Sequence, residues 1–183
     1  MTPSSIRLTL KRSYRTIICA LLVPVLMLLV TIVGLSFQYS SCIENIETAN
    51  TLRETVGDQI TEEVWQIVSG NLAFEDGKQY AYMSRIVNGI QVLESSSSAQ
   101  SSQYLQAAAR ATETMKNYFD ILGKQIAENR AVAYRESVME EITSVARLID
   151  EMLQNYTVEE IVRIGELNRQ IQSTTFVMVI ISF

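Results

Sequence analysis

The chain of 183 residues has no histidine, two prolines and seven glycines. Without histidine there is no Ser-His or Cys-His nucleophile pair, no imidazole metal ligand and no histidine acid–base catalyst. Proline and glycine are the residues that most often end helices, so their scarcity favours long helices. The chain therefore has few places to turn.

Cysteine is also scarce: Cys19 and Cys42 are the two cysteines, and they are too far apart for the spacing of a metal site. They cannot pair within one extended helix, because a disulfide needs Cα atoms within about 7 Å of each other. We interpret both as ordinary small residues, and a Cys42–Cys42 bridge across a dimer is the alternative. Phosphate-binding glycine loops and the CxxC, HExxH and GxSxG motifs are absent, so no catalytic, cofactor or metal residue is predicted.

Charge is divided unevenly along the chain. The first 15 residues hold four bases (Arg7, Lys11, Arg12 and Arg15) and no acid, whereas the remaining 11 bases and all 20 acids follow residue 43 and give a net charge of −9. A nucleic-acid-binding protein needs a basic face. This sequence has none, so no nucleic-acid partner is expected.

Residues 17–37 form an uncharged apolar run of 21 residues. A helix of this length is about 31 Å long, which matches the bilayer hydrocarbon thickness of about 30 Å. The run predicts a transmembrane helix. By the positive-inside rule the basic tail 1–16 stays cytoplasmic, with Arg7, Lys11, Arg12 and Arg15 as orientation determinants. A cleavable signal peptide is the alternative, but its apolar region is usually about 7–15 residues long.

A second apolar stretch occupies residues 174–183 and reads FVMVIISF from Phe176 onward. A stretch of eight residues, seven of them apolar, cannot span a bilayer. We interpret the stretch as the start of a truncated second transmembrane helix and expect the chain to be a fragment of a longer protein. A short hydrophobic tail is the alternative.

Between these segments, apolar residues recur every three or four positions, which predicts helices over 38–69, 78–94, 102–128 and 131–173. Turns are expected at Gly70-Asn71 with Asp76-Gly77, in the serine-rich stretch 95–102, and at 128–130. The helices rise and return by about 48, 25, 40 and 64 Å, so the path closes at the membrane. The predicted fold is all-α: a transmembrane helix leads into an elongated up-down four-helix bundle over 38–173, which returns to the truncated second transmembrane helix.

Two stripes of apolar residues carry this prediction. The first, in a helix that Gly57 weakens, comprises Ile43, Ile46, Ala49, Leu52, Val56, Ile60, Val64 and Ile67. The second comprises Tyr134, Val138, Ile142, Val145, Ile149, Met152 and Tyr156 and is nearly a heptad seam.

The second stripe fails at the expected position Glu159 and resumes at Ile161, which predicts a phase slip. The sequence Thr157-Val158-Glu159-Glu160 also has the form of a capping box that could start a new helix. We interpret the slip as a local bend. The functional alternative is a signalling hinge at Tyr156, Thr157, Glu160 and Ile161.

The aromatic side chains are predicted to pack in the helix core, and the alternative is that they line a small-ligand pocket. They are Trp65, Phe74, Tyr80, Tyr82, Tyr104, Tyr118, Phe119 and Tyr134. Neither interpretation identifies a ligand.

The order of basic tail, transmembrane helix, helical extracytoplasmic region and second transmembrane helix resembles the input half of bacterial sensor histidine kinases, especially YesM-like kinases. The segments VWQIVSGNLAF (64–74) and VARLIDEMLQNYTVEEIVRIGELNRQIQ (145–172) share the character of that family. The resemblance covers nearly the whole chain but is architectural. It implies a parallel homodimer in the bacterial cell membrane. It also implies a HAMP linker, a phosphoacceptor histidine domain and an ATP-binding kinase domain after residue 183, and only that part would use ATP and a response regulator.

These features predict the sensing and signalling module of a two-component sensor histidine kinase, whose full-length form is a protein-histidine kinase. An unidentified extracytoplasmic ligand or binding protein would shift the bundle between two packings, and the first and fourth helices would carry the shift inward. The alternatives are the input half of a methyl-accepting chemotaxis receptor and a membrane-tethered structural or adaptor bundle.

Overall fold

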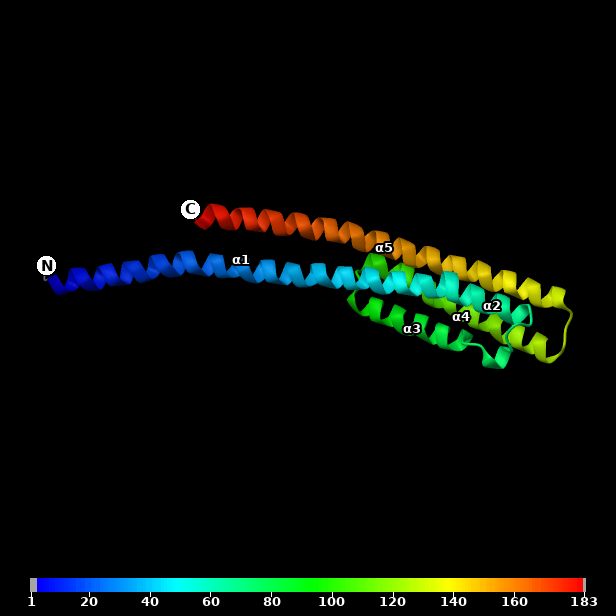
Figure 1. Cartoon of the computed structure of the whole chain (residues 1–183). Helices are drawn as coiled ribbons and strands as arrows, with labels where there is room; N and C mark the ends of the chain where they lie inside the picture. Colours follow the sequence, from blue (N-terminus) through cyan, green and yellow to red (C-terminus); the bar gives the residue numbers. More distant parts are fainter. Residues whose placement is uncertain (1–2, 183) are drawn as a thin grey trace. The chain divides into compact units, whose positions relative to one another are not determined.

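A computed structural model of the chain describes the backbone of residues 3–182 and the side chains of residues 22–180. Over that range the chain is helical with short turns and has no strand, which confirms the all-α prediction. The elements are α1 (Pro3–Glu54), η1 (Thr55–Ile60), α2 (Thr61–Val68), η2 (Phe74–Asp76), α3 (Gln79–Ser96), α4 (Ala99–Ala127) and α5 (Val132–Ser182) (Figure 1).

The chain divides into two compact units. One unit is Ser41–Arg163, a helical bundle; the other combines Met1–Ser40 with Ile164–Phe183. The helices α1 and α5 are each long enough to contribute residues to both units, whereas α2, α3 and α4 belong to the bundle alone.

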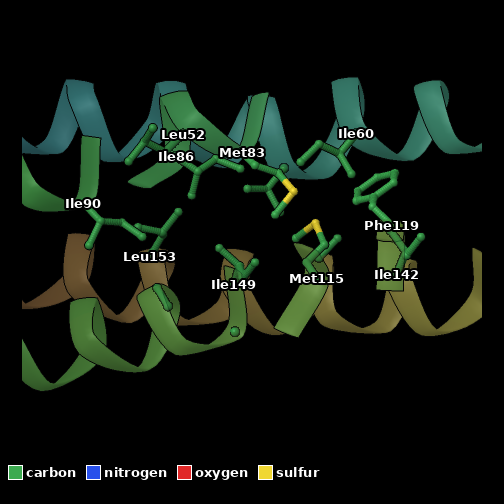
Figure 2. Close-up of a cluster of buried hydrophobic side chains, with 14 of the residues drawn as sticks. Leu52, Ile60, Met83, Ile86, Ile90, Met115, Phe119, Ile142, Ile149 and Leu153 are labelled. Carbon is green, nitrogen blue, oxygen red and sulfur yellow. The ribbon is translucent and has the colours of Figure 1, made fainter. Parts of the chain in front are cut away.

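One apolar core runs through the bundle, and α1, η1, α2, α3, α4 and α5 all contribute to it. Figure 2 shows Ile60 of η1, Met115 and Phe119 of α4 and Ile142 of α5 pointing toward one another. Each of these side chains is fully buried. Burying a side chain of this size contributes about 1.5–3 kcal/mol, so the repeated apolar positions of the sequence are what hold the helices together.

The first stripe keeps to one face of its helix because the helix changes its winding. The spacing from Leu52 through Val56 and Ile60 to Val64 is four residues at each step, and on an α-helix each such step overshoots by about 40°. The π-helical turn η1 lies within this stretch, and its wider turn is consistent with the burial of all four side chains. Gly57, predicted only to weaken the helix, lies in η1.

The turns near residues 70–77 and 128–130 are confirmed. Gly70 ends the first helical run with φ +80°, a left-handed conformation that glycine adopts without strain. Lys78 donates its backbone N–H to the Glu63 carboxylate, and Gln79 Nε2 donates to the Phe74 carbonyl at 2.9 Å, so side chains tie the turn to both flanking helices. Asn129 has φ +53° at the other turn.

The predicted serine-rich loop over 95–102 is wrong. Only Ser97 and Ser98 lie outside the helices, because α3 continues to Ser96 and α4 begins at Ala99. Ser98 accepts a hydrogen bond from the Ser101 backbone N–H at 3.2 Å and so caps α4. The serines that were predicted to form a loop instead end α3 and cap α4.

Among the described residues, one helix, containing Leu22–Val68, is by length and composition able to cross a membrane. Many apolar side chains of its first part, residues 22–37, are exposed; they include Leu22, Val23, Leu26, Met27, Val30, Val33 and Phe37. Arg7, Lys11, Arg12 and Arg15 lie in α1, but their side chains are outside the described ones, and their orienting role stays a prediction. In α5, Phe176, Val177, Val179 and Ile180 are exposed as well.

Candidate functional site

The buried seam of α5 continues past Tyr156 to a glutamate. Its members are Val138, Ile142, Ala146, Ile149, Leu153, Tyr156 and Glu160, in steps of three and four residues. The predicted phase slip is therefore wrong, since Glu160 takes the next core position and is 0% exposed. Apolar residues alone had defined the stripe, so a polar member was counted as a gap.

The capping-box interpretation is wrong for the same stretch, because α5 runs without interruption from Val132 to Ser182. Thr157 Oγ1 donates to the Leu153 carbonyl at 2.9 Å, one turn back in the same helix, instead of starting a new one. Of the four predicted hinge residues, Tyr156, Thr157 and Glu160 are buried, whereas Ile161 is 54% exposed and lies on another face of α5.

The first stripe also begins with residues that were not predicted for it. Cys42 and Asn45 are buried in α1, whereas Ile43, the predicted start of the stripe, is 46% exposed. The Cys42 thiol is thus covered within its own bundle, and a Cys42–Cys42 bridge between two chains is not accessible in this packing.

The end of α3 and the short turn that follows it are hydrogen-bonded to both α1 and α5. Ser96 Oγ donates to Asn45 Oδ1 of α1 at 3.0 Å, and Ser97 Oγ donates to Tyr156 Oη of α5 at 3.3 Å. Arg163 Nη1 donates to the Ser96 carbonyl oxygen at 3.4 Å. We call the polar end of the core the Glu160 cluster; it comprises Cys42, Asn45, Ser96, Ser97, Tyr156, Glu160 and Arg163.

Among the members of the cluster, Glu160 is the residue whose burial opposes folding most. Both of its carboxylate oxygens are buried, and neither accepts a hydrogen bond of ordinary geometry from the described residues. Arg163 Nη1 is 3.6 Å from Oε1, an ion-pair distance beyond a good hydrogen bond, and the Arg163 side chain is one-third exposed. Asn45 Nδ2 is also buried, with no hydrogen-bond partner among the residues whose side chains are described. Burying polar groups in this way opposes folding unless another interaction compensates.

The cluster suppresses ionisation of its thiol and phenol. Burial, and then the hydrogen bonding and charge of the adjoining Glu160, raise the pKa of the Cys42 thiol to about 11, although Arg163 acts the other way. Burial also raises the pKa of Tyr156 to about 12, with Ser97 opposing the shift and the charge of Glu160 adding to it. Cys42 is therefore a neutral thiol near pH 7, which disfavours nucleophilic chemistry.

The aromatic residues do not converge on one pocket. Phe119 is fully buried in the core, whereas Trp65, Tyr80 and Tyr134 are largely exposed. An open groove of about 560 Å³ lies between α3 and α4; its lining is Tyr80, Met83, Ser84, Val87, Ala109, Thr112, Glu113 and Lys116. No group of three cysteine or carboxylate side chains that could hold a metal ion occurs in the described part of the chain.

The sequence interpretation named Tyr156, Thr157 and Glu160 and missed the partners that the fold brings to them. The signal for Cys42 and Asn45 is present, because they precede Ala49 by seven and four residues and so share its face. Ser96 and Ser97 carried no such signal, since their place depends on where α3 ends.

Comparison of the chain with protein-family models, curated proteins and solved structures finds no match, so function is inferred from the residues themselves.

Proposed function

We propose that the chain is the extracytoplasmic sensing and transmembrane signalling module of a two-component sensor histidine kinase. The observation that carries the proposal is the composition of its two longest helices. The helix α1 holds both the exposed apolar residues 22–37 and core residues of the bundle. The helix α5 likewise holds core residues up to Glu160 and the exposed apolar residues 176–180.

In this proposal residues 17–37 cross the bacterial cell membrane with the basic tail 1–16 in the cytoplasm. Residues 38–173 form an up-down four-helix bundle outside, and residues 174–183 enter the bilayer again. The tail carries only positive charge, which supports the proposed orientation of the first helix in the membrane. The core shared by four helical segments supports the bundle. The resemblance to sensor kinases adds a parallel homodimer, and ATP and a response regulator would act only through a kinase part.

The bundle would signal by changing how α1 and α5 pack. An extracytoplasmic ligand or binding protein with different affinities for two packings would shift the population between them. A displacement of either helix would reach the apolar segments, because each helix is continuous up to them. The ion pair between Arg53 Nε and Asp150 Oδ1, at 2.8 Å, links these two helices directly.

Membrane topology is the first test. Cys42 is a poor reporter because it is buried, so Asn88→Cys, at an exposed position of α3, serves instead in a chain with Cys19 and Cys42 replaced by serine. A membrane-impermeant maleimide applied to whole cells should label Asn88→Cys and should label Ser5→Cys only after lysis. The reverse pattern would sink the proposed orientation.

Transmission is the second test. Residues 1–183 are joined to the cytoplasmic half of a sensor kinase, and one to four alanines are inserted after Arg163. A helix turns about 100° per residue, so kinase output should vary with the number of insertions and return near four. Output that stays constant for every insertion favours a structural or adaptor bundle. The same series on the cytoplasmic half of a methyl-accepting chemotaxis receptor tests that alternative.

A further inference from the structure

The packing of the bundle is uneven where α1 enters it and α5 leaves it. At most levels of the core, α1 and α5 present apolar side chains such as Leu52, Ile149 and Leu153. At the last level they present Cys42, Asn45 and Glu160 instead, and all three are buried. The two helices assigned to transmission therefore meet through polar groups at this end of the bundle.

These polar groups are poorly satisfied as they stand. Within the described residues no nitrogen or hydroxyl group donates to either Glu160 oxygen, and the adjoining Cys42 thiol is only a weak donor; Asn45 Nδ2 donates no hydrogen bond. Arg163 is the nearest counter-charge, yet its Nη1 donates to the Ser96 carbonyl and stays 3.6 Å from Glu160 Oε1. An arginine and a carboxylate are most stable as a bidentate hydrogen-bonded pair, and this geometry is not one.

We propose that Glu160 is a switch residue, whose buried carboxylate destabilises the packing described here relative to a second packing in which it reaches water. A small rotation or slide of α5 against α1 is sufficient to expose it, because Arg163, one turn further along the same helix, is already one-third exposed. The bundle would then populate two packings of similar free energy, which is the condition for a weak signal to shift it.

Cys42 is a native reporter of this equilibrium. Its thiol is buried beside Glu160, so an alkylating reagent reaches it only when the polar end of the core opens. The full chain with Cys19→Ala, in lipid nanodiscs at pH 7.5, is treated with N-ethylmaleimide, and the labelling rate is measured by mass spectrometry. Thermal unfolding followed by circular dichroism is recorded in parallel.

Glu160→Leu should slow labelling about tenfold and raise the unfolding midpoint by about 2–4 °C, because replacing a buried charge by an apolar group removes its desolvation cost. The slowing runs against the chemistry of the thiol. Since Glu160 raises the pKa of Cys42, its removal alone would increase the thiolate fraction and speed labelling. Glu160→Gln, which keeps the shape, should change both quantities in the same direction by less.

Two variants serve as controls. Glu159→Gln removes the neighbouring carboxylate, which is outside the core and hydrogen-bonds Gln100 Nε2 at 3.3 Å, and should leave both quantities unchanged. Arg163→Gln removes the nearest counter-charge and should speed labelling, but should have little effect when Glu160 is already leucine. This non-additivity separates a charge effect from general loosening.

Faster or unchanged labelling together with a lower midpoint in both Glu160→Leu and Glu160→Gln would overturn the inference, since Glu160 would then stabilise the described packing. That the second packing carries a signal rests on the proposed function. The labelling experiment does not: slower labelling with constant kinase output in the alanine-insertion series keeps the switch and rejects the proposed function.

Discussion

The middle and the polar end of the bundle core have the same helical spacing but differ in chemistry. In the middle, Ile60, Phe119 and Ile142 are fully buried and purely apolar. At the end, Asn45 and Glu160 are buried as well but are polar. Spacing decides which residues are covered, whereas residue type decides whether covering them stabilises the fold. The middle therefore holds the helices together, and the end is where a small change in packing alters the free energy.

The largest expected effect is in the middle. Phe119→Ala should destabilise the chain by about 3–5 kcal/mol, because it removes a fully buried ring and leaves a cavity in the core. Chemical denaturation of the full chain in detergent micelles measures the change. Ile121→Ala, two residues away and 44% exposed, is the control and should cost well under 1 kcal/mol. Equal losses in the two variants would show that the core does not carry the stability.

Alkaline pH should weaken the polar end selectively. The pKa of Cys42 is raised from 9.0 to about 11 and that of Tyr156 from 10.0 to about 12. Raised values mean that the folded state favours the neutral forms, so their contribution is complete below about pH 9 and is lost as pH rises toward 12. Cys42→Ala with Tyr156→Phe should remove about 1–3 kcal/mol of the pH dependence of unfolding over this interval. An unchanged slope would contradict the burial of these groups.

Close packing between α1 and α3 gives a smaller effect. A Cβ added at Gly89 would lie 2.6 Å from Leu52 Cδ2. Overpacking costs about 1–3 kcal/mol, against the gain of about 1 kcal/mol that alanine brings to a helix. Gly89→Ala should therefore lower stability by about 1 kcal/mol. Gly57→Ala, where a Cβ would meet nothing within 4 Å, should raise stability instead, and thermal unfolding of both variants measures the contrast.

The ion pair between Arg53 and Asp150 should have the smallest effect. Both side chains are about one-third exposed, so solvent screens an interaction at 2.8 Å. A double-mutant cycle with Arg53→Gln and Asp150→Asn should give a coupling of about 0.2–1 kcal/mol that decreases in 0.5 M salt. A coupling free energy above about 2 kcal/mol would mean that this pair contributes as much to stability as a buried side chain of the core.

Periodicity predicted the apolar core well and the polar end poorly. Leu52, Val56, Ile60, Ile142 and Ile149 were named from their spacing, and all are buried, because the spacing reflects helix geometry directly. Tyr134 is exposed, and the apolar neighbours Ala146 and Leu153 are buried in place of the partly buried Val145 and Met152. Two further errors lie near the polar end of the bundle. Ile43 and Ile161 are exposed while Cys42 and Glu160 are covered, a choice that tertiary packing makes and local hydrophobicity cannot.

Helix ends, too, were predicted well at some positions and poorly at others. Gly70 predicted a turn correctly, because a left-handed residue needs glycine for a physical reason. The serines of 95–102 were misread because serine is common both in flexible linkers and at helix caps. Which role it takes depends on the partners that the fold supplies, here Ser101 for Ser98 and Asn45 for Ser96.

The π-helical turn at Thr55–Ile60 has a consequence for changes in chain length. Losing one residue from an ordinary helix rotates everything beyond the lesion by about 100°, which would turn one half of the α1–α2 stripe out of the core. A π turn holds one residue more than an α turn, so a single-codon loss inside it can be absorbed by reverting to regular winding. Among the residues of α1, η1 and α2 in the bundle, this short stretch is therefore where the gene can shorten by one codon while both flanks keep their register.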